Sequence, residues 1–161
     1  GSQRPRVRDC LACNNGTDGL FLCWRVRHGL FTNNVLQGNR RFGISIGHKD
    51  SDNILSRNVV RSNHQDGVFF RNETLGMAAH RNRLEENVIE NNGVGREAAG
   101  IRIRGYTNDL VFKNNIIRDT RNTEEQKQTV GIRIEDHVGQ ITLDGNKVTA
   151  KTAIDDRRPE K

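Results

Sequence analysis

The chain has 161 residues, with 26 Lys and Arg against 20 Asp and Glu, a formal charge of +6 and a pI near 9.7. That length predicts one domain, and the excess of basic residues favours anionic partners. No apolar stretch approaches the roughly 20 residues that a membrane-spanning helix needs. Aromatic residues make up 5% of the chain, too few for a platform on which single-stranded bases stack. We therefore expect neither a membrane protein nor a nucleic-acid-binding protein.

Residues 1–13 form a polar lead-in that begins like a cloning scar and shows no signal peptide. The lead-in holds Cys10 and Cys13, and Cys23 follows it. A C-x-x-C without a second pair argues against a structural zinc site, and a disulfide between two of the three would require export. We expect instead three small buried side chains.

A Gly followed by two apolar residues one position apart recurs along the chain. These repeats begin at Gly19, Gly43, Gly67, Gly100 and Gly131. Each is followed by an apolar residue three positions before an Asn, and these are Asn34, Asn58, Asn87, Asn115 and Asn146. The basic unit is 24 residues, the step from Gly19 to Gly43, and extra residues enter only in the later units. A strict repeat of this kind indicates a solenoid.

The apolar residues alternate with a period of two, as in Ile44/Ile46 and Ile101/Ile103, which predicts short strands with one buried face. A strand this short cannot bury its face alone. Successive coils stacked about 4.8 Å apart would form continuous parallel sheets around an apolar interior.

The Asn column predicts a ladder, because each amide can donate to and accept from its equivalent in the next coil. A shorter column follows five residues later, at Asn39, Asn63 and Asn92. Thr120 and Lys151 end this second column, so we expect the corner geometry to change in the last two coils.

These repeats resemble the right-handed parallel β-helix superfamily, which includes pectate lyases, polygalacturonases, alginate epimerases and periplasmic copper-site assembly proteins. The resemblance covers roughly residues 14–150 and implies an all-β, right-handed parallel β-helix of about five to six coils. The C-terminal tail, residues 151–161, should fray. Members of these families usually have more coils and a helical cap, so we expect a fragment or a protein that self-associates through open solenoid ends.

The outward positions of the Gly-led strands should form one exposed face that is rich in cations. An Arg side chain binds carboxylates through its planar fork, so this face predicts an acidic polysaccharide as partner. The candidate substrate-binding residues are Arg25, Arg102, Arg104, Tyr106 and Arg133. The alternative is that these side chains only keep the sheet soluble.

The densest group of acid–base residues begins just after the second Gly-led strand and continues into the next coil. General acid–base chemistry needs such groups close together, with cations that shift their pKa values. The candidate catalytic residues are His48, Lys49, Asp50, Asp66, Arg71, Glu73 and His80. In a lyase or epimerase, His48 or Lys49 would be the base and Arg71 would neutralise the uronate carboxylate. The alternative is that this corner, with its mixture of His, Lys and Asp, is a solvent-exposed turn without a catalytic role.

In a hydrolase, Asp50 with Asp66 or Glu73 would form the acid–base pair. The acidic residues Asp50, Asp52 and Asp66 could also bind calcium, although no Asp-rich loop has regular ligand spacing. We expect no other cofactor and no other metal.

Three insertions, at residues 73–81, 93–99 and 119–130, map to corners of the solenoid, where they often wall a binding face. The last two share a corner of neighbouring coils and should touch. Three functions remain open: a lyase, epimerase or hydrolase acting on acidic polysaccharide, a non-catalytic glycan-binding or anion-binding β-helix, and a self-associating structural solenoid. The resemblance implies a secreted or periplasmic protein.

Overall fold

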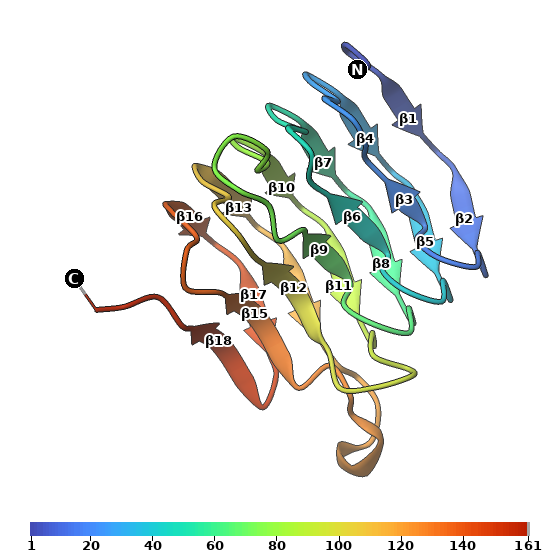
Figure 1. Ribbon diagram of the computed structural model, residues 1–161. Coiled ribbons are helices and arrows are strands. Elements are labelled where there is room, and N and C mark those ends of the chain that lie inside the picture. Colours follow the sequence, from blue (N-terminus) through green and yellow to red (C-terminus); the bar gives the residue numbers. More distant parts are fainter. Residues whose placement is uncertain (161) are drawn as a thin grey trace.

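The computed structural model, which describes residues 1–160, is a parallel β-solenoid built from three sheets of six strands (Figure 1). Sheet I contains β1 (Arg6–Arg8), β4 (Leu30–Thr32), β7 (Ile54–Ser56), β10 (Arg83–Glu85), β13 (Leu110–Lys113) and β16 (Ile141–Asp144). Sheet II contains β2 (Leu11–Cys13), β5 (Val35–Gln37), β8 (Val59–Arg61), β11 (Val88–Glu90), β14 (Ile116–Arg118) and β17 (Lys147–Thr149). Sheet III contains β3 (Leu20–Phe21), β6 (Ile44–Ile46), β9 (Val68–Phe70), β12 (Ala99–Ile103), β15 (Val130–Ile134) and β18 (Thr152–Asp156). The predicted all-β parallel β-helix is confirmed.

Equivalent residues of the repeat pair across every sheet, which stacks the apolar columns in the interior. In sheet III, Ile44 pairs with Val68, Val68 with Ile101, and Ile101 with Ile132. All four side chains are buried. Each strand contributes only one to three inward side chains, as Leu36 alone does in β5, so the core forms only when the coils stack.

The predicted Asn ladder runs through the solenoid. The side-chain amide of Asn58 donates to Asn87 Oδ1 at 3.0 Å, and the amide of Asn87 donates to Asn115 Oδ1 at 3.0 Å. A further pair, from Asn53 to Asn82 at 3.0 Å, lines another corner that the sequence pattern did not single out. Amide groups that would be costly to bury alone are thus satisfied by the next coil.

The second Asn column does not end where the sequence predicted. The amide of Asn92 donates to Gln128 Oε1 at 2.8 Å, so Gln128 takes the place that had been assigned to Thr120. The prediction was wrong because it counted five residues from the first column. The insertion after β14 moves the structurally equivalent position to a later residue. The longer Gln side chain preserves the amide contact.

The solenoid extends beyond the expected 14–150. Strands β1 and β2 in the lead-in pair with β4 and β5, and β18 in the C-terminal tail pairs with β15. The three cysteines are free, and they are not buried as expected: Cys10 and Cys23 are exposed, and Cys13 is half-buried. All three lie in the first coil of the described residues.

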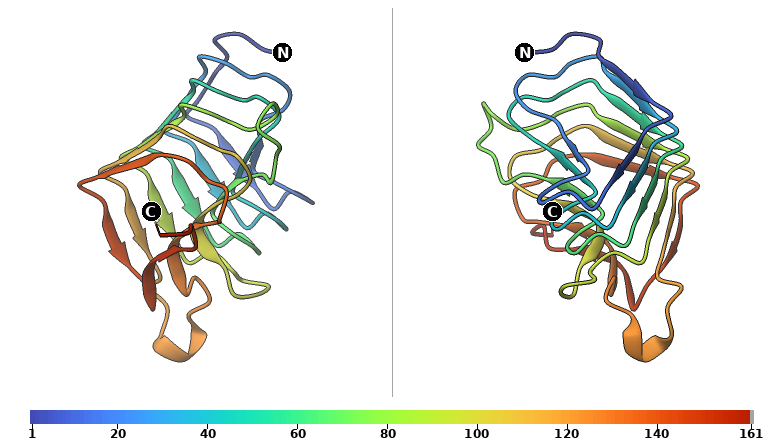
Figure 2. Two further views of the ribbon diagram at one scale, coloured as in Figure 1. Left: turned by 60° about the vertical axis from the view of Figure 1, so that its left-hand side comes forward. Right: turned by 90° about the vertical axis from the view of Figure 1, so that its right-hand side faces the viewer.

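The insertions leave the stack at its corners, and the one between β14 and β15 protrudes furthest (Figure 2). It contains a short 3-10 helix at Thr123–Glu125. The backbone N–H of Ala98 donates to Lys127 O at 2.8 Å, which confirms that the two neighbouring insertions touch. No helix among residues 1–160 is both long and apolar enough to span a membrane.

Candidate functional site

The outward side chains of sheet III stack in register, coil upon coil, and form what we call the sheet III face. Its first row pairs Phe21 with Ser45, Ser45 with Phe69, Phe69 with Arg102, and Arg102 with Arg133. This first row therefore contains Phe21, Ser45 and Phe69 in its first three coils and two cations, Arg102 and Arg133, in its later ones. Two further rows follow in the turn after the strands: Cys23, Gly47, Arg71, Arg104 and Glu135, and then Arg25, Lys49, Glu73, Tyr106 and His137.

Arg71 lies at the centre of this face, directly after β9, and its side chain is only 13% exposed. Its Nη1 donates to Ser45 Oγ at 2.9 Å and its Nη2 donates to the backbone oxygen of Leu22 at 2.8 Å. The guanidinium also lies 4.5 Å from the ring centroid of Phe21, a cation–π distance. At Gly47 a Cβ would come within 2.5 Å of Arg71 Nε, so only glycine leaves room for this placement.

His48 contacts three side chains from the two coils on either side of its own. Its Nε2 lies 3.1 Å from Glu73 Oε1, and its Nδ1 lies 3.3 Å from both Cys23 Sγ and Arg71 Nη2. Because a guanidinium can only donate, the contact with Arg71 places the lone pair on Nδ1 and the ring proton on Nε2, which donates to Glu73. The His48 side chain is 31% exposed, so a ligand on the face can reach it.

Asp50 supports this cluster from the interior. Its side chain is fully buried, and its carboxylate accepts from the backbone N–H groups of Val26 at 2.8 Å and Gly47 at 3.2 Å. Burial raises the pKa of Asp50 and lowers the pKa of Arg71, and the two groups lie 3.3 Å apart. Asp50 therefore positions Arg71 and the turn, and it cannot touch a polymer as a catalytic acid would.

Two other predicted catalytic residues lie apart from the cluster. Asp66 precedes β9, at the opposite end of sheet III, where its buried carboxylate accepts from Ala99 N at 2.7 Å. His80 lies near the end of the 73–81 insertion, and its backbone N–H donates to Ser51 Oγ at 3.0 Å. Asp50 follows β6 and Asp66 precedes β9, so the two lie at opposite ends of the strands, which does not favour their predicted pairing.

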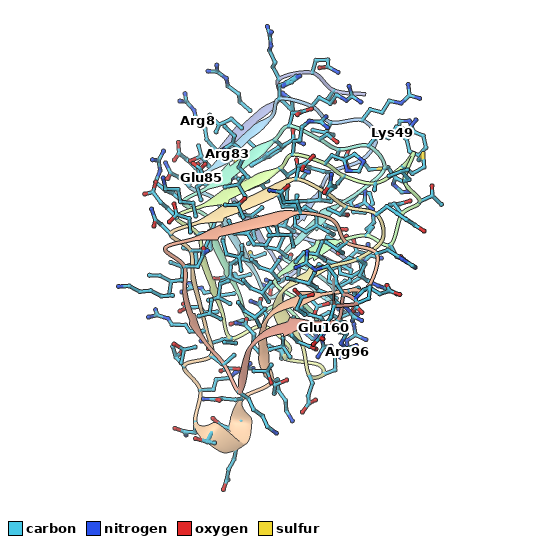
Figure 3. All side chains as sticks on the ribbon, turned by 90° about the vertical axis from the view of Figure 1, so that its left-hand side faces the viewer. Arg8, Lys49, Arg83, Glu85, Arg96 and Glu160 are labelled. Atoms are coloured by element: carbon cyan, nitrogen blue, oxygen red, sulfur yellow. The ribbon has the colours of Figure 1, made fainter. Side chains whose placement is uncertain are left out.

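Lys49 follows His48 in the chain and projects from the rim of the coils, on the side opposite Arg83 and Glu85 (Figure 3). Arg25 is exposed, and its backbone N–H donates to the backbone oxygen of His48 at 3.0 Å. Both cations therefore border the His48 turn.

The cations of the later coils differ in how they are paired. Arg102 binds Glu135 at 2.9 Å and Arg133 binds Asp155 at 2.9 Å, so both are neutralised in ladders along the sheet. Arg104 is half-buried, and its guanidinium has no ion-pair or hydrogen-bond partner within residues 1–160. Of the predicted substrate-binding residues in these coils, Arg104 is the cation that remains available to an anion.

No three His, Cys, Asp or Glu side chains within the described part of the chain converge as metal ligands. The three acidic residues considered for calcium are engaged separately, since Asp52 forms a bidentate ion pair with Arg81 at 2.6 and 3.0 Å. The structure brings two unpredicted residues to the cluster, Cys23 and Trp24, whose ring centroid lies 5.1 Å from that of His48. Counting 24 residues back from the His48 turn would have found both.

The family described as "Periplasmic copper-binding protein (NosD)" matches residues 1–146. Two similar proteins of Azotobacter vinelandii are the mannuronan C5-epimerases AlgE5 and AlgE3. AlgE5 is 33% identical over 72 residues, which are 45% of this chain and 7% of AlgE5. AlgE3 is 39% identical over 62 residues, which are 38% of this chain and 3% of AlgE3. The chain thus spans less than a tenth of either relative.

Among solved structures, a mutant of the periplasmic alginate epimerase AlgG is similar in fold, with a TM-score of 0.55 and 15% sequence identity. The match covers 96% of this chain and 40% of that one. At this level of identity the similarity concerns the fold alone.

Proposed function

This chain belongs to the family described as periplasmic copper-binding protein (NosD), and we propose that its sheet III face binds an acidic polysaccharide and moves a proton at a uronate residue. The proposal extends to this chain what the names of AlgE5 and AlgE3 state of those proteins. The observation that carries it is the His48–Glu73 pair at 3.1 Å on an open face that also carries Arg104. The family description favours a periplasmic location.

Arg104 is the group that we assign to the uronate carboxylate. Arg71 was the expected partner, but its Nη1 and Nη2 already donate to Ser45 and Leu22 and its side chain is largely buried. Arg104 occupies the equivalent position in the next coil, since Arg102 pairs with Phe69 two residues earlier. A bidentate contact would hold the carboxylate and disperse the charge that develops beside it when the neighbouring proton leaves.

His48 is the group that we assign to proton transfer. Its Nδ1 lone pair would take the proton in place of the 3.3 Å contact with Arg71 Nη2, which must be given up, and Glu73 would stabilise the resulting imidazolium through the Nε2–H contact. Lys49 is the alternative base, since it follows His48 at the same rim. Delivery of a proton from water to the opposite face of the sugar would epimerise the residue, whereas departure of the glycosidic oxygen, with the electron pair of the broken C–H bond forming a double bond, would cleave the chain and leave an unsaturated end. The buried Asp50 and the distant Asp66 do not favour hydrolysis.

The test is incubation with polymannuronate and a panel of other acidic and neutral polysaccharides, with NMR and mass spectrometry of the products. We expect His48→Ala to lower turnover by at least about 100-fold, the usual contribution of a general base. We expect Arg104→Ala to weaken binding by about 10-fold or more, the usual loss when a hydrogen bond to a charged group is removed. The matched controls are His64→Ala, at another corner, and Arg83→Ala, on sheet I.

Each outcome of this test decides part of the proposal. Saturated products with an inverted uronate would establish an epimerase, and unsaturated ends would establish a lyase. Binding that depends on Arg104 without any product would leave a glycan-binding β-helix and refute the proton transfer. No product and no binding from any polymer, with the protein folded, would refute the whole proposal.

A second function, binding of a copper ion, is favoured by one contact. Cys23 Sγ lies 3.3 Å from His48 Nδ1, and a soft sulfur with an imidazole nitrogen suits copper(I). The fit is limited to these two donors, and the Arg71 guanidinium 3.3 Å from the same Nδ1 opposes a cation. Titration with copper(I) against a chromophoric chelator tests this function: Cys23→Ser should abolish binding and Cys10→Ser should not. Equal binding by both variants would refute it.

A further inference from the structure

A hollow of about 370 Å³ lies beside the sheet III face, at the corner that follows its outer row. Three successive coils line it. Leu75 and His80 follow β9, Tyr106 and Asp109 follow β12, and His137 follows β15. The backbone N–H of Tyr106 donates to the backbone oxygen of Glu73 at 3.1 Å. The hollow therefore adjoins both the His48–Glu73 pair and Arg104, which is two residues before Tyr106.

The walls of the hollow present apolar surface to solvent. The rings of Tyr106 and His137 stack with their centroids 4.9 Å apart and their planes 1° from parallel. Tyr106 is 41% exposed and Leu75 is 67% exposed. The electron-rich face of an aromatic ring attracts the partly positive C–H bonds of a sugar ring, and burying such surface is favourable. The hollow thus offers a stacking platform to a sugar.

The charges around the hollow disfavour an anion. The one Arg or Lys among the lining residues, Arg81, is already held by both carboxylate oxygens of Asp52, at 2.6 and 3.0 Å. The carboxylate of Asp109 also lines the hollow and accepts from the side chain of Asn108 at 3.0 Å. A uronate there would meet the Asp109 carboxylate and no available guanidinium among the lining residues, whereas the hydroxyl groups of a neutral sugar would find acceptors and donors.

We propose that this hollow is a subsite for a neutral sugar, so that the polysaccharide is a heteropolymer in which the uronate bound at Arg104 is followed by an uncharged residue. This inference rests on the proposed function and narrows its substrate class. The negative charge of Asp109 would repel the carboxylates of a polymer made only of uronates. The uncharged ring would be favoured by contact with Tyr106, His137 and Leu75.

The experiment compares two hexasaccharides by isothermal titration calorimetry with the full chain. One is a hexamer of mannuronate, and the other alternates glucuronate with N-acetylglucosamine, so the two differ in whether every second residue is charged. We expect the alternating hexamer to bind about 10-fold more tightly, the upper range for one aromatic contact. Tyr106→Ala should remove this preference by weakening only the alternating hexamer.

Two further variants separate this inference from the proposed function. Arg104→Ala should weaken both hexamers, and Val94→Ala, an exposed apolar residue in another insertion, should change neither. Equal or tighter binding of the mannuronate hexamer, with the Arg104 effect present, would overturn the neutral subsite alone. Binding of neither hexamer would overturn the proposed function, and the subsite with it.

Discussion

Asn87 is a central rung of the Asn ladder, and Asn87→Ala removes four hydrogen bonds. Asn87 Oδ1 accepts from the backbone N–H of Asn58 at 2.9 Å and from its side-chain amide at 3.0 Å. The Asn87 amide donates to Leu55 O at 2.9 Å and to Asn115 Oδ1 at 3.0 Å. Every one of these groups is buried, so water cannot replace the lost partner.

The expected cost is about 3–5 kcal/mol, from four bonds at about 1 kcal/mol each and the backbone N–H of Asn58 left buried without a partner. That is a large fraction of the roughly 5–15 kcal/mol that holds a typical domain together. The cavity term is small, because an amide replaced by a methyl group removes few atoms.

Urea unfolding followed by circular dichroism measures the loss. Because a solenoid can unfold coil by coil, the comparison holds only where the dependence of the free energy on urea is unchanged between variants. We expect the midpoint of unfolding to fall clearly for Asn87→Ala.

Two matched variants calibrate this result. Asn146→Ala, at the half-exposed end of the ladder, removes three bonds. Because Asn146 itself is half-exposed, we expect water to enter the space that its side chain leaves, so the cost should be about 1–2 kcal/mol. Asn122→Ala, at an exposed position without a side-chain hydrogen bond, should stay within about 0.5 kcal/mol of the wild type. If Asn87→Ala were no worse than Asn122→Ala, the ladder would contribute nothing to stability and the reasoning would fail.

Gly43→Ala would force a methyl group into the Val60 side chain, so it should lower the free energy of unfolding by about 1–3 kcal/mol. Gly16→Ala, with open space around it, should lower it little. Equal urea midpoints for the two variants would contradict this prediction. Burial raises the pKa of Asp66, so ionisation destabilises the folded chain as pH rises above the unfolded value near 3.9. Asp66→Asn should therefore have a higher Tm than wild type at pH 7, and thermal scans should show no such gain at pH 3; a gain equal at both values would exclude burial as its cause. If the open ends self-associate, Ile154→Lys in β18, where Ile154 is 46% exposed, should lower the molar mass measured by light scattering at high concentration; a wild-type mass already monomeric would refute self-association.

The sequence determined the architecture because the physics of the repeat is local and periodic. Ile44 and Ile46 alternate with outward residues, and a Gly precedes them at a fixed distance from the next Asn. Such a pattern has one solution, a parallel stack with the apolar column and the amide column inside. The same reasoning failed for Gln128 because an insertion changed the count between equivalent positions without changing the amide contact.

The sequence also indicated which face carries the acid–base groups, but not which of them are buried supports and which face a ligand. His48, Asp50 and Arg71 were all candidates, and nothing in their spacing distinguishes a buried support from a group that faces a ligand. Only the tertiary structure shows that Asp50 is fully buried and that His48 is partly open. Exposure depends on where the next coil lies, which a single repeat does not encode.

The pairing of charges was likewise decided by the tertiary structure. Arg102 and Arg104 are two positions apart on one strand and its turn, yet Arg102 is bound by Glu135 from the next coil and Arg104 has no partner among the described residues. The sequence determined that cations line this face because strand periodicity places them there. Which cation is available depends on side chains about 30 residues away in sequence that lie about 4.8 Å away in space, the spacing between stacked strands.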